Sequence, residues 1–113
     1  MQTSSNGDFM AEISRVQITV LKKTDTKQIF GDKPPLGQAI EPCSVFEEGQ
    51  EFIVNESGDM PEGFCPAAWN DLYKVIFALA FGGNFPWMKK KGTSISCCID
   101  GLRPVIFELK RIE

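Results

Sequence analysis

Cys65 is the residue of this sequence best placed to do chemistry, because it directly precedes a proline that opens a helical pattern. Proline favours the first position of a helix, and the residue before it favours extended backbone. The pair therefore predicts a helix beginning at Pro66 with Cys65 as its N-cap. Free backbone N–H groups and the positive end of the helix dipole meet there, which favours a reactive thiolate.

The chain has four cysteines and no histidine. Without histidine, Cys–His nucleophiles, Ser–His–Asp triads and histidine metal ligands are excluded. Cys65 with a second thiol nearby could form a reversible disulfide, and Cys98 and Cys43 are the candidate partners. The catalytic candidates of a thiol-dependent protein are therefore Cys65 and Cys98.

The adjacent residues Cys97 and Cys98 belong to a strand pattern, so their side chains are expected on opposite faces. Cys97 shares its face with Ile95 and Ile99, and that face is apolar. We therefore expect Cys97 in the core, where a free cysteine packs as a small apolar side chain, and Cys98 at a surface or cleft.

Cysteine thiolates could also bind zinc or an iron–sulfur cluster. The spacing disfavours this, because no Cys-x-x-Cys pair occurs and two of the four cysteines are adjacent. A metal site made of Cys43, Cys65 and Cys98 is the form of this hypothesis that stays open.

Aromatic residues on and after the predicted helix form a second group of candidates. Trp69 and Tyr73 fall on one helix face, and Phe85 and Trp87 lie in the loop that follows. These four rings could line a small-molecule pocket, or they could close the core over the helix.

Arg103 is the one isolated basic residue near Cys98. It could bind an anionic ligand or stabilise a nearby thiolate. A surface ion pair with Asp100 is the competing interpretation.

Hydrophobic periodicity indicates the elements that must position these residues. Strands are predicted near 15–24, 45–54, 94–99 and 104–112, with a short helical turn at 27–30 and the main helix at 66–81. Gly82-Gly83 is a strong stop signal for that helix. The order β-β-α-β-β predicts an α+β fold, a small antiparallel sheet or partly rolled barrel with one central helix. Residues 1–12 are predicted to be a disordered tail, and residues 13–113 a single domain.

Residues 15–113 also resemble a family of small, uncharacterised, cysteine-containing proteins of bacteria and archaea, which are common in anaerobes. The matching segments are Cys43-x-Val45-Phe46-x-x-Gly49-x-x-Phe52, Gly63-Phe64-Cys65-x-x-x-Trp69, Gly82-Gly83-x-Phe85-Pro86-Trp87 and Cys97-Cys98-x-Asp100-Gly101-x-Arg103-Pro104-Val105. The resemblance implies that these cysteine, tryptophan and glycine positions belong to a shared pattern. It implies no activity and no cofactor.

Composition narrows the function further. A net charge of −3 argues against a nucleic-acid partner, and the longest apolar run, 75–81, is too short to cross a membrane. No signal-peptide pattern precedes the domain, so a cytoplasmic protein with reduced thiols is expected.

A binding or accessory module with a thiol-lined pocket is the first functional hypothesis. A thiol-dependent redox protein or enzyme and a metal-binding module are the alternatives, and the apolar end of the helix favours a homo-oligomer.

Overall fold

The computed structural model describes residues 13–38 and 40–112 of the 113-residue chain, so the predicted tail at 1–12 lies outside the described residues. Its elements follow the predicted order with one short helix added where a helical turn was expected. In chain order they are β1 (Arg15–Lys23), α2 (Thr26–Phe30), β2 (Glu51–Val54), α3 (Pro66–Ala80), β3 (Thr93–Cys97) and β4 (Val105–Ile112).

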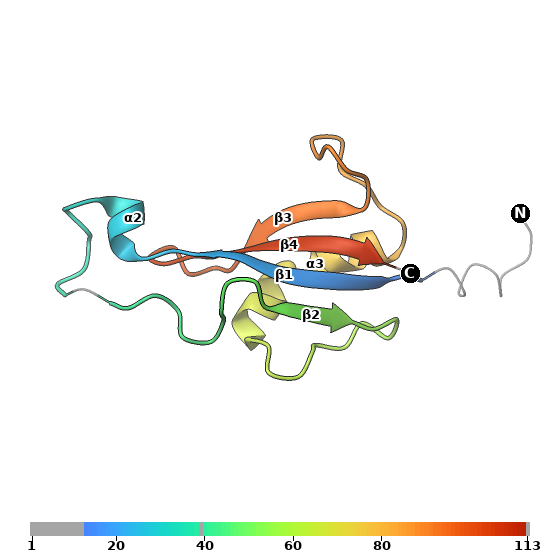
Figure 1. The fold of residues 1–113 in the computed structure, drawn as a ribbon, viewed down its shortest axis with the longest axis horizontal. Coiled ribbons are helices and arrows are strands. Elements are labelled where there is room, and N and C mark those ends of the chain that lie inside the picture. The colour runs from blue at the N-terminus through green and yellow to red at the C-terminus, as the bar shows by residue number, and fades with distance from the viewer. Residues whose placement is uncertain (1–12, 39, 113) are drawn as a thin grey trace, which may run out of the picture.

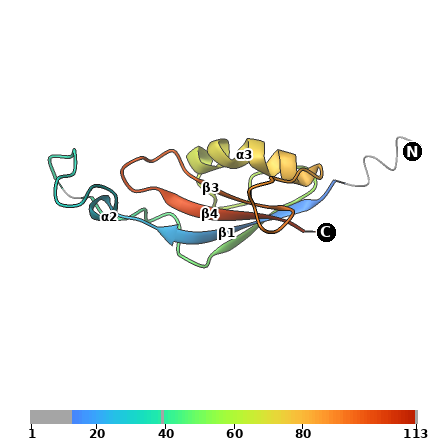
Figure 2. The same cartoon turned by 90° about the horizontal axis from the view of Figure 1, so that it is seen from above.

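The four strands form one antiparallel sheet in the order β2-β1-β4-β3 (Figure 1). Helix α3 lies across one face of that sheet (Figure 2). The predicted α+β fold with an antiparallel sheet and one main helix is confirmed. The sheet does not close into a barrel, because β2 and β3 are its two edges. Within the described residues no helix has the length and apolar character needed to cross a membrane.

The core lies between α3 and the sheet. Strand alternation turns every second residue of β1 and β4 toward the helix, and the helical repeat turns a matching stripe of α3 toward the sheet. Full burial of each such side chain is worth roughly 1.5–3 kcal/mol. In these three elements the buried apolar residues are Val16, Ile18 and Val20 of β1, Val105, Phe107 and Leu109 of β4, and Ala68, Leu72, Ile76 and Leu79 of α3, and Phe46, Val54 and Phe64 complete the core.

Both ends of α3 follow from the sequence. Cys65 is the N-cap in extended backbone, with φ −73° and ψ 121°, and Pro66 occupies the first helical turn, as predicted. At the other end Gly82 takes φ +94°, which glycine adopts without strain. The N–H of Gly83 donates to the carbonyl of Ala78 at 2.8 Å, and the N–H of Gly82 donates to Leu79 at 3.0 Å. This is a Schellman motif, and it stops the helix at the predicted glycine pair.

The short helix α2 occupies part of the long loop predicted between the first two strands. Asp25 caps it, because the Asp25 carboxylate accepts from the Gln28 N–H and the Gln28 side chain accepts from the Asp25 N–H, both at 2.8 Å. Such a capping box satisfies donors at the helix start. Helix α2 follows the end of β1 and projects beyond the sheet (Figure 1).

The prediction that Cys97 lies in the core is wrong: Cys97 is exposed. Strand β3 turns its other face inward, because Ser94 pairs with the buried Leu109 of β4 and is itself buried. Ile95 therefore lies on the open face of the sheet and is 46% exposed. The register with β4 therefore decides which face of β3 points inward.

Candidate functional site

Three of the four cysteines line one pocket of about 210 Å³, which we call the thiol pocket. Cys43 comes from the loop before β2, Cys65 from the start of α3, and Cys98 from the residue after β3. Asp100 and Arg103 of the β3–β4 connection also line it. The fold thus brings together Cys43, Cys65, Cys98 and Arg103, all four of which the sequence singled out.

The floor of the thiol pocket is apolar. Phe46 and Val105 line it and are buried in the core, with exposed fractions of 1% and 0%. The three cysteines themselves are partly buried and pack against the same core. The pocket is therefore a recess in the wall of the core with sulfur atoms along its sides.

Cys65 lies at the N-terminus of α3, as its N-cap. Its carbonyl accepts the first helical hydrogen bond, from the N–H of Trp69 at 2.9 Å, but its side chain makes no capping hydrogen bond. Ala67 and Ala68, in the first turn of the helix, line the pocket beside it. The Cys65 thiol consequently does not serve to cap the helix.

Cys98 follows the last β3–β4 pair, Cys97 with Ile106, and is held by two hydrogen bonds to Val105. Its N–H donates to the Val105 carbonyl at 3.2 Å, and the Val105 N–H donates to its sulfur at 3.3 Å. The next residue, Ile99, donates its N–H to the Asp71 carboxylate of α3 at 2.6 Å. This contact pulls the chain out of the strand, so β3 ends at Cys97 instead of at the predicted Ile99, and Cys98 faces the thiol pocket.

Arg103 links two segments of the chain that line the pocket. Its Nε lies 3.2 Å from the Asp100 carboxylate, and its Nη1 donates to the Glu41 carbonyl in the segment that leads to Cys43. Burial acts to raise the pKa of Asp100. Hydrogen bonds from the Leu102 N–H and from Arg103, with the charge of Arg103, outweigh burial, so the Asp100 pKa lies below its ordinary value. The predicted ion pair between Asp100 and Arg103 is present.

Cys43, Cys65 and Cys98, the residues of the predicted metal site, line one pocket but are not arranged so that they could bind a metal ion. Among residues 13–38 and 40–112, no three His, Cys, Asp or Glu side chains are arranged so that they could hold a metal ion. The arrangement therefore gives no support to a metal-binding module.

The four aromatic candidates lie in two separate pairs. Trp69 and Tyr73 are in ring contact near the start of α3, at 5.6 Å between centroids, and Phe85 and Trp87 are in contact after its end, at 5.3 Å. Trp69 and Tyr73 lie within α3, which ends at Ala80, whereas Phe85 and Trp87 lie in the loop after it. None of the four lines the thiol pocket. Trp69 and Phe85 pack against the core, which agrees with the interpretation that rings close it.

A second cavity, of about 230 Å³, was not anticipated from the sequence. It lies between the second half of α3 and the neighbouring ends of β1 and β2, and Tyr73 and Phe77 line it. Their rings are 6.0 Å apart, and both side chains are exposed on the helix. The four-residue spacing of these rings was a readable signal, because it places them one above the other on a helix.

No protein-family model matches this sequence, and no curated protein or solved structure matches it. The resemblance to the small cysteine-containing family therefore stays a prediction carried by the residues alone. The function has to be inferred from the thiol pocket itself.

Proposed function

We propose that the protein is a small binding or accessory module whose ligand occupies the thiol pocket. The observation that carries the proposal is the convergence of Cys43, Cys65 and Cys98 on one recess from three segments of the chain. Free cysteines that serve only packing are usually fully buried in a core. These three are partly buried and stand around an open volume, which is where a ligand can reach them.

The lining of the pocket suggests a small, neutral and mostly apolar ligand. Its volume of about 210 Å³ is below the range of sites for drug-sized molecules. Its floor is apolar and its walls carry polarisable sulfur. Arg103 already pairs with Asp100 and the Glu41 carbonyl, so its charge is not reserved for an anion.

A fragment screen by protein-observed NMR tests this proposal. We expect neutral fragments to bind wild-type protein with shifts at Cys43, Cys65 and Cys98. The Cys43→Leu variant fills part of the pocket and should lose binding about tenfold or more, whereas Cys97→Leu, at the exposed cysteine outside the pocket, should bind as wild type. Equal binding by Cys43→Leu, or fragments that bind only elsewhere, would refute it.

A thiol-dependent redox function is the second candidate. It is favoured by Cys65, whose side chain is free of capping and lies in a pocket with two further thiols. With a disulfide such as oxidised glutathione, the Cys65 thiolate would attack one sulfur and release one glutathione thiolate. Cys98 or Cys43, as a thiolate, would then attack the Cys65 sulfur and release the second, leaving a protein disulfide.

Intact-protein mass spectrometry after treatment with oxidised glutathione distinguishes this candidate. The expected product has lost two hydrogen atoms and carries no glutathione. Cys65→Ser should abolish that product and Cys97→Ser should preserve it. A product that depends on Cys97, or glutathione retained on every cysteine, would rule out a disulfide within the pocket.

The proposed setting is the cytoplasm, where the thiols would stay reduced. The proposed partner is a small molecule and not a nucleic acid, because the chain has a net charge of −3 and domains that bind nucleic acids are usually basic.

A further inference from the structure

The loop between α3 and β3 carries an exposed tryptophan and an exposed run of lysines. We call residues 84–92 the Trp87 loop. Trp87 is 73% exposed and is the most exposed aromatic side chain of the described residues, although its ring contacts Phe85. The lysines at 89–91 are exposed as well. In the part of the chain that the structure describes, their ammonium groups have no ion-pair partner. One short loop therefore displays an apolar ring together with three positive charges.

Hydrogen bonds at its base hold the Trp87 loop in shape. The Asn84 side chain accepts from the Gly92 N–H and from the Arg111 guanidinium, both at 2.8 Å, so it joins the two ends of the loop. The Thr93 hydroxyl donates to the Lys90 carbonyl at 2.6 Å. The loop thus has a defined conformation before it meets any partner.

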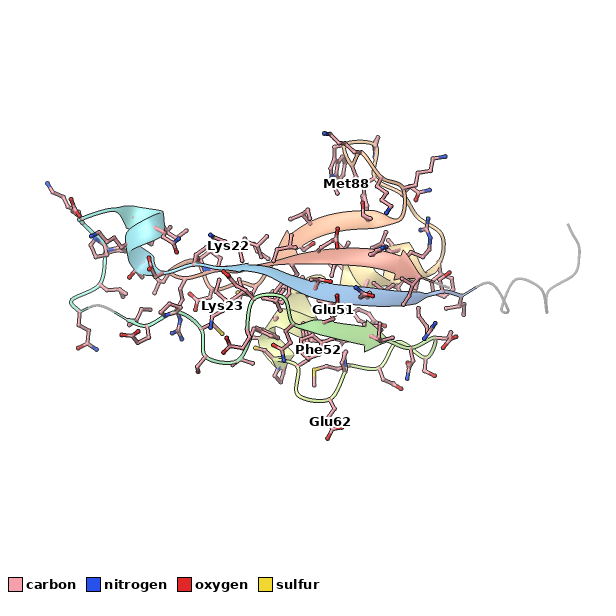
Figure 3. All side chains as sticks on the ribbon, in the orientation of Figure 1. Lys22, Lys23, Glu51, Phe52, Glu62 and Met88 are labelled. Atoms are coloured by element: carbon pink, nitrogen blue, oxygen red, sulfur yellow. The ribbon has the colours of Figure 1, made fainter. Side chains whose placement is uncertain are left out.

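A tight turn places Trp87 at the exposed part of the loop. The Met88 N–H donates to the Phe85 carbonyl at 3.0 Å, so Pro86 and Trp87 are the central residues of the turn. Phe85 packs against the core, whereas Trp87 remains largely exposed. The loop, marked by Met88 in Figure 3, projects past the β3 edge of the sheet. Packing within this chain therefore does not explain the tryptophan.

The charge around the Trp87 loop differs in sign from the charge of the whole chain. No Asp or Glu occurs between Asp71 and Asp100, which is the longest acid-free stretch of the sequence. The net charge of the chain is nevertheless −3, so the excess of negative charge lies in other segments. A negatively charged surface would attract the molecule at the Trp87 loop and repel those other segments.

We propose that the Trp87 loop docks the protein on the surface of a lipid bilayer that contains anionic lipids. Tryptophan prefers the headgroup level, where its ring meets apolar groups and its indole N–H meets polar ones. The lysines beside it carry flexible stems whose ammonium groups can reach anionic headgroups. Such docking is peripheral and needs no segment that crosses the membrane.

The residue types favour a lipid surface over other negatively charged partners. Single-stranded nucleic acids are bound by basic grooves with several rings for stacking, whereas this loop projects and exposes one tryptophan. Carboxylates of a protein partner are matched best by arginine forks, and the cations of the Trp87 loop are all lysines. Because one ring and three charges carry the attachment, weak and reversible binding is expected.

Co-sedimentation with vesicles is the first test. We expect full-length wild-type protein to bind vesicles of equal parts phosphatidylserine and phosphatidylcholine, and not vesicles of phosphatidylcholine alone. Salt should release it, because salt screens the lysines. Replacing Lys89, Lys90 and Lys91 together with glutamine should weaken binding about a hundredfold, since each lysine near an anionic surface contributes about fivefold. Trp87→Ser should weaken it about tenfold.

Matched controls remove the same groups from other places. Replacing Lys22, Lys27 and Lys33 with glutamine changes the net charge equally, and all three are exposed. Lys22 lies toward the end of β1 that is remote from the start of β3, and the other two follow in and after α2 (Figure 1). Ile99→Ser removes an apolar side chain that is 76% exposed. Both controls should bind vesicles as wild type, and circular dichroism checks that every variant is folded.

Tryptophan fluorescence tests whether the ring enters the bilayer. The chain has two tryptophans, so Trp69→Phe leaves Trp87 as the sole emitter. Its emission should shift to the blue with anionic vesicles, and brominated lipid should quench it. Cys43→Leu should bind vesicles as wild type, because Cys43 lines the thiol pocket and lies outside the Trp87 loop. Failure of lipid docking is therefore distinguishable from failure of the proposed function.

Four results would overturn the proposal. The first is wild-type protein that stays in solution with anionic vesicles, and the second is an equal loss of binding in the two triple lysine variants. The third is binding without a fluorescence shift, which would mean that the lysines adsorb without insertion of the ring. The fourth is binding of a single-stranded oligonucleotide through this loop without binding of vesicles, which would assign the loop to nucleic acids.

Discussion

Arg111 of β4 donates a hydrogen bond to the carbonyl of Leu79, the penultimate residue of α3, at 3.1 Å. The same guanidinium donates to the Gly83 carbonyl at 2.6 Å and to the Asn84 side chain at 2.8 Å. The last carbonyls of a helix have no partner within it, and they mark its negative end. Arg111 therefore adds a cationic donor at the negative end of α3, beside the Gly82 N–H that also bonds Leu79, and fastens this end of the helix to the sheet.

Replacing Arg111 with methionine should lower the free energy of unfolding by about 1–3 kcal/mol, because it removes the side-chain donor to the Gly83 carbonyl and the second donor to the Leu79 carbonyl. Methionine keeps most of the apolar stem, so the loss reports on the hydrogen bonds. Lys110→Met, at the next residue of β4, is the control and should change stability by less than about 0.5 kcal/mol. Urea unfolding gives both values. Equal losses in the two variants would contradict the role of Arg111.

Gly83→Ala should destabilise the protein by roughly 1–3 kcal/mol, the usual cost of forcing extra volume into a tight site. A Cβ at this position would lie 2.8 Å from the carbonyl oxygen of Ala78, and backbone atoms cannot move aside cheaply. Gly101→Ala is the matched control, because a Cβ there meets nothing within 4 Å. Thermal unfolding of the two variants should separate them, and an unchanged melting temperature for Gly83→Ala would show that the helix end relaxes freely.

Local signals in the sequence predicted much of the fold. The Cys65-Pro66 start, the Gly82-Gly83 stop and the alternation of β1 each depend on neighbours within a few residues, so the sequence alone shows them. The face of β3 that points toward the helix does not depend on neighbouring residues in this way. Ser94 is buried because it lies opposite Leu109, and no pattern within β3 shows which face its partner strand turns toward the helix.

The sequence predicted which residues belong to the candidate site, but not that they lie together in the fold. Cys43, Cys65 and Cys98 were named from residue type and local context. Their convergence depends on two contacts distant in sequence, Ile99 with Asp71 and Arg103 with the Glu41 carbonyl. The separation of Trp69 from Phe85 likewise follows from the length of α3 between them, which places the two rings near opposite ends of the helix.

The ion pair of Asp100 and Arg103 should make stability depend on pH in the acid range. The pKa of Asp100 is lower in the folded protein than its ordinary value of 3.8, so the folded state favours the charged form. Its contribution is fully present above that ordinary value and is lost as the pH falls through the lower, folded pKa. The effect should be small and sensitive to salt, since both side chains are about one-third exposed.

Urea unfolding of wild type and Asp100→Asn from neutral pH to the acid limit measures this contribution. The wild type should be the more stable at neutral pH, and the difference should narrow on acidification. Glu108→Gln, on the open face of the sheet, controls for a general loss of negative charge. A difference that stays constant with pH would show that the Asp100 side chain acts through shape alone.

The four cysteines should react with iodoacetamide at different rates under native conditions. Cys97 is exposed on the open face of the sheet, while Cys43, Cys65 and Cys98 are partly buried around the thiol pocket. Solvent exposure alone therefore favours reaction at Cys97. Peptide mass spectrometry after brief labelling should find Cys97 modified early. Cys65 should be the fastest of the three pocket thiols, because its side chain makes no capping bond, whereas the Cys98 sulfur accepts from the Val105 N–H. If Cys98 reacts before both Cys97 and Cys65, the burial and contacts assigned to these thiols are wrong.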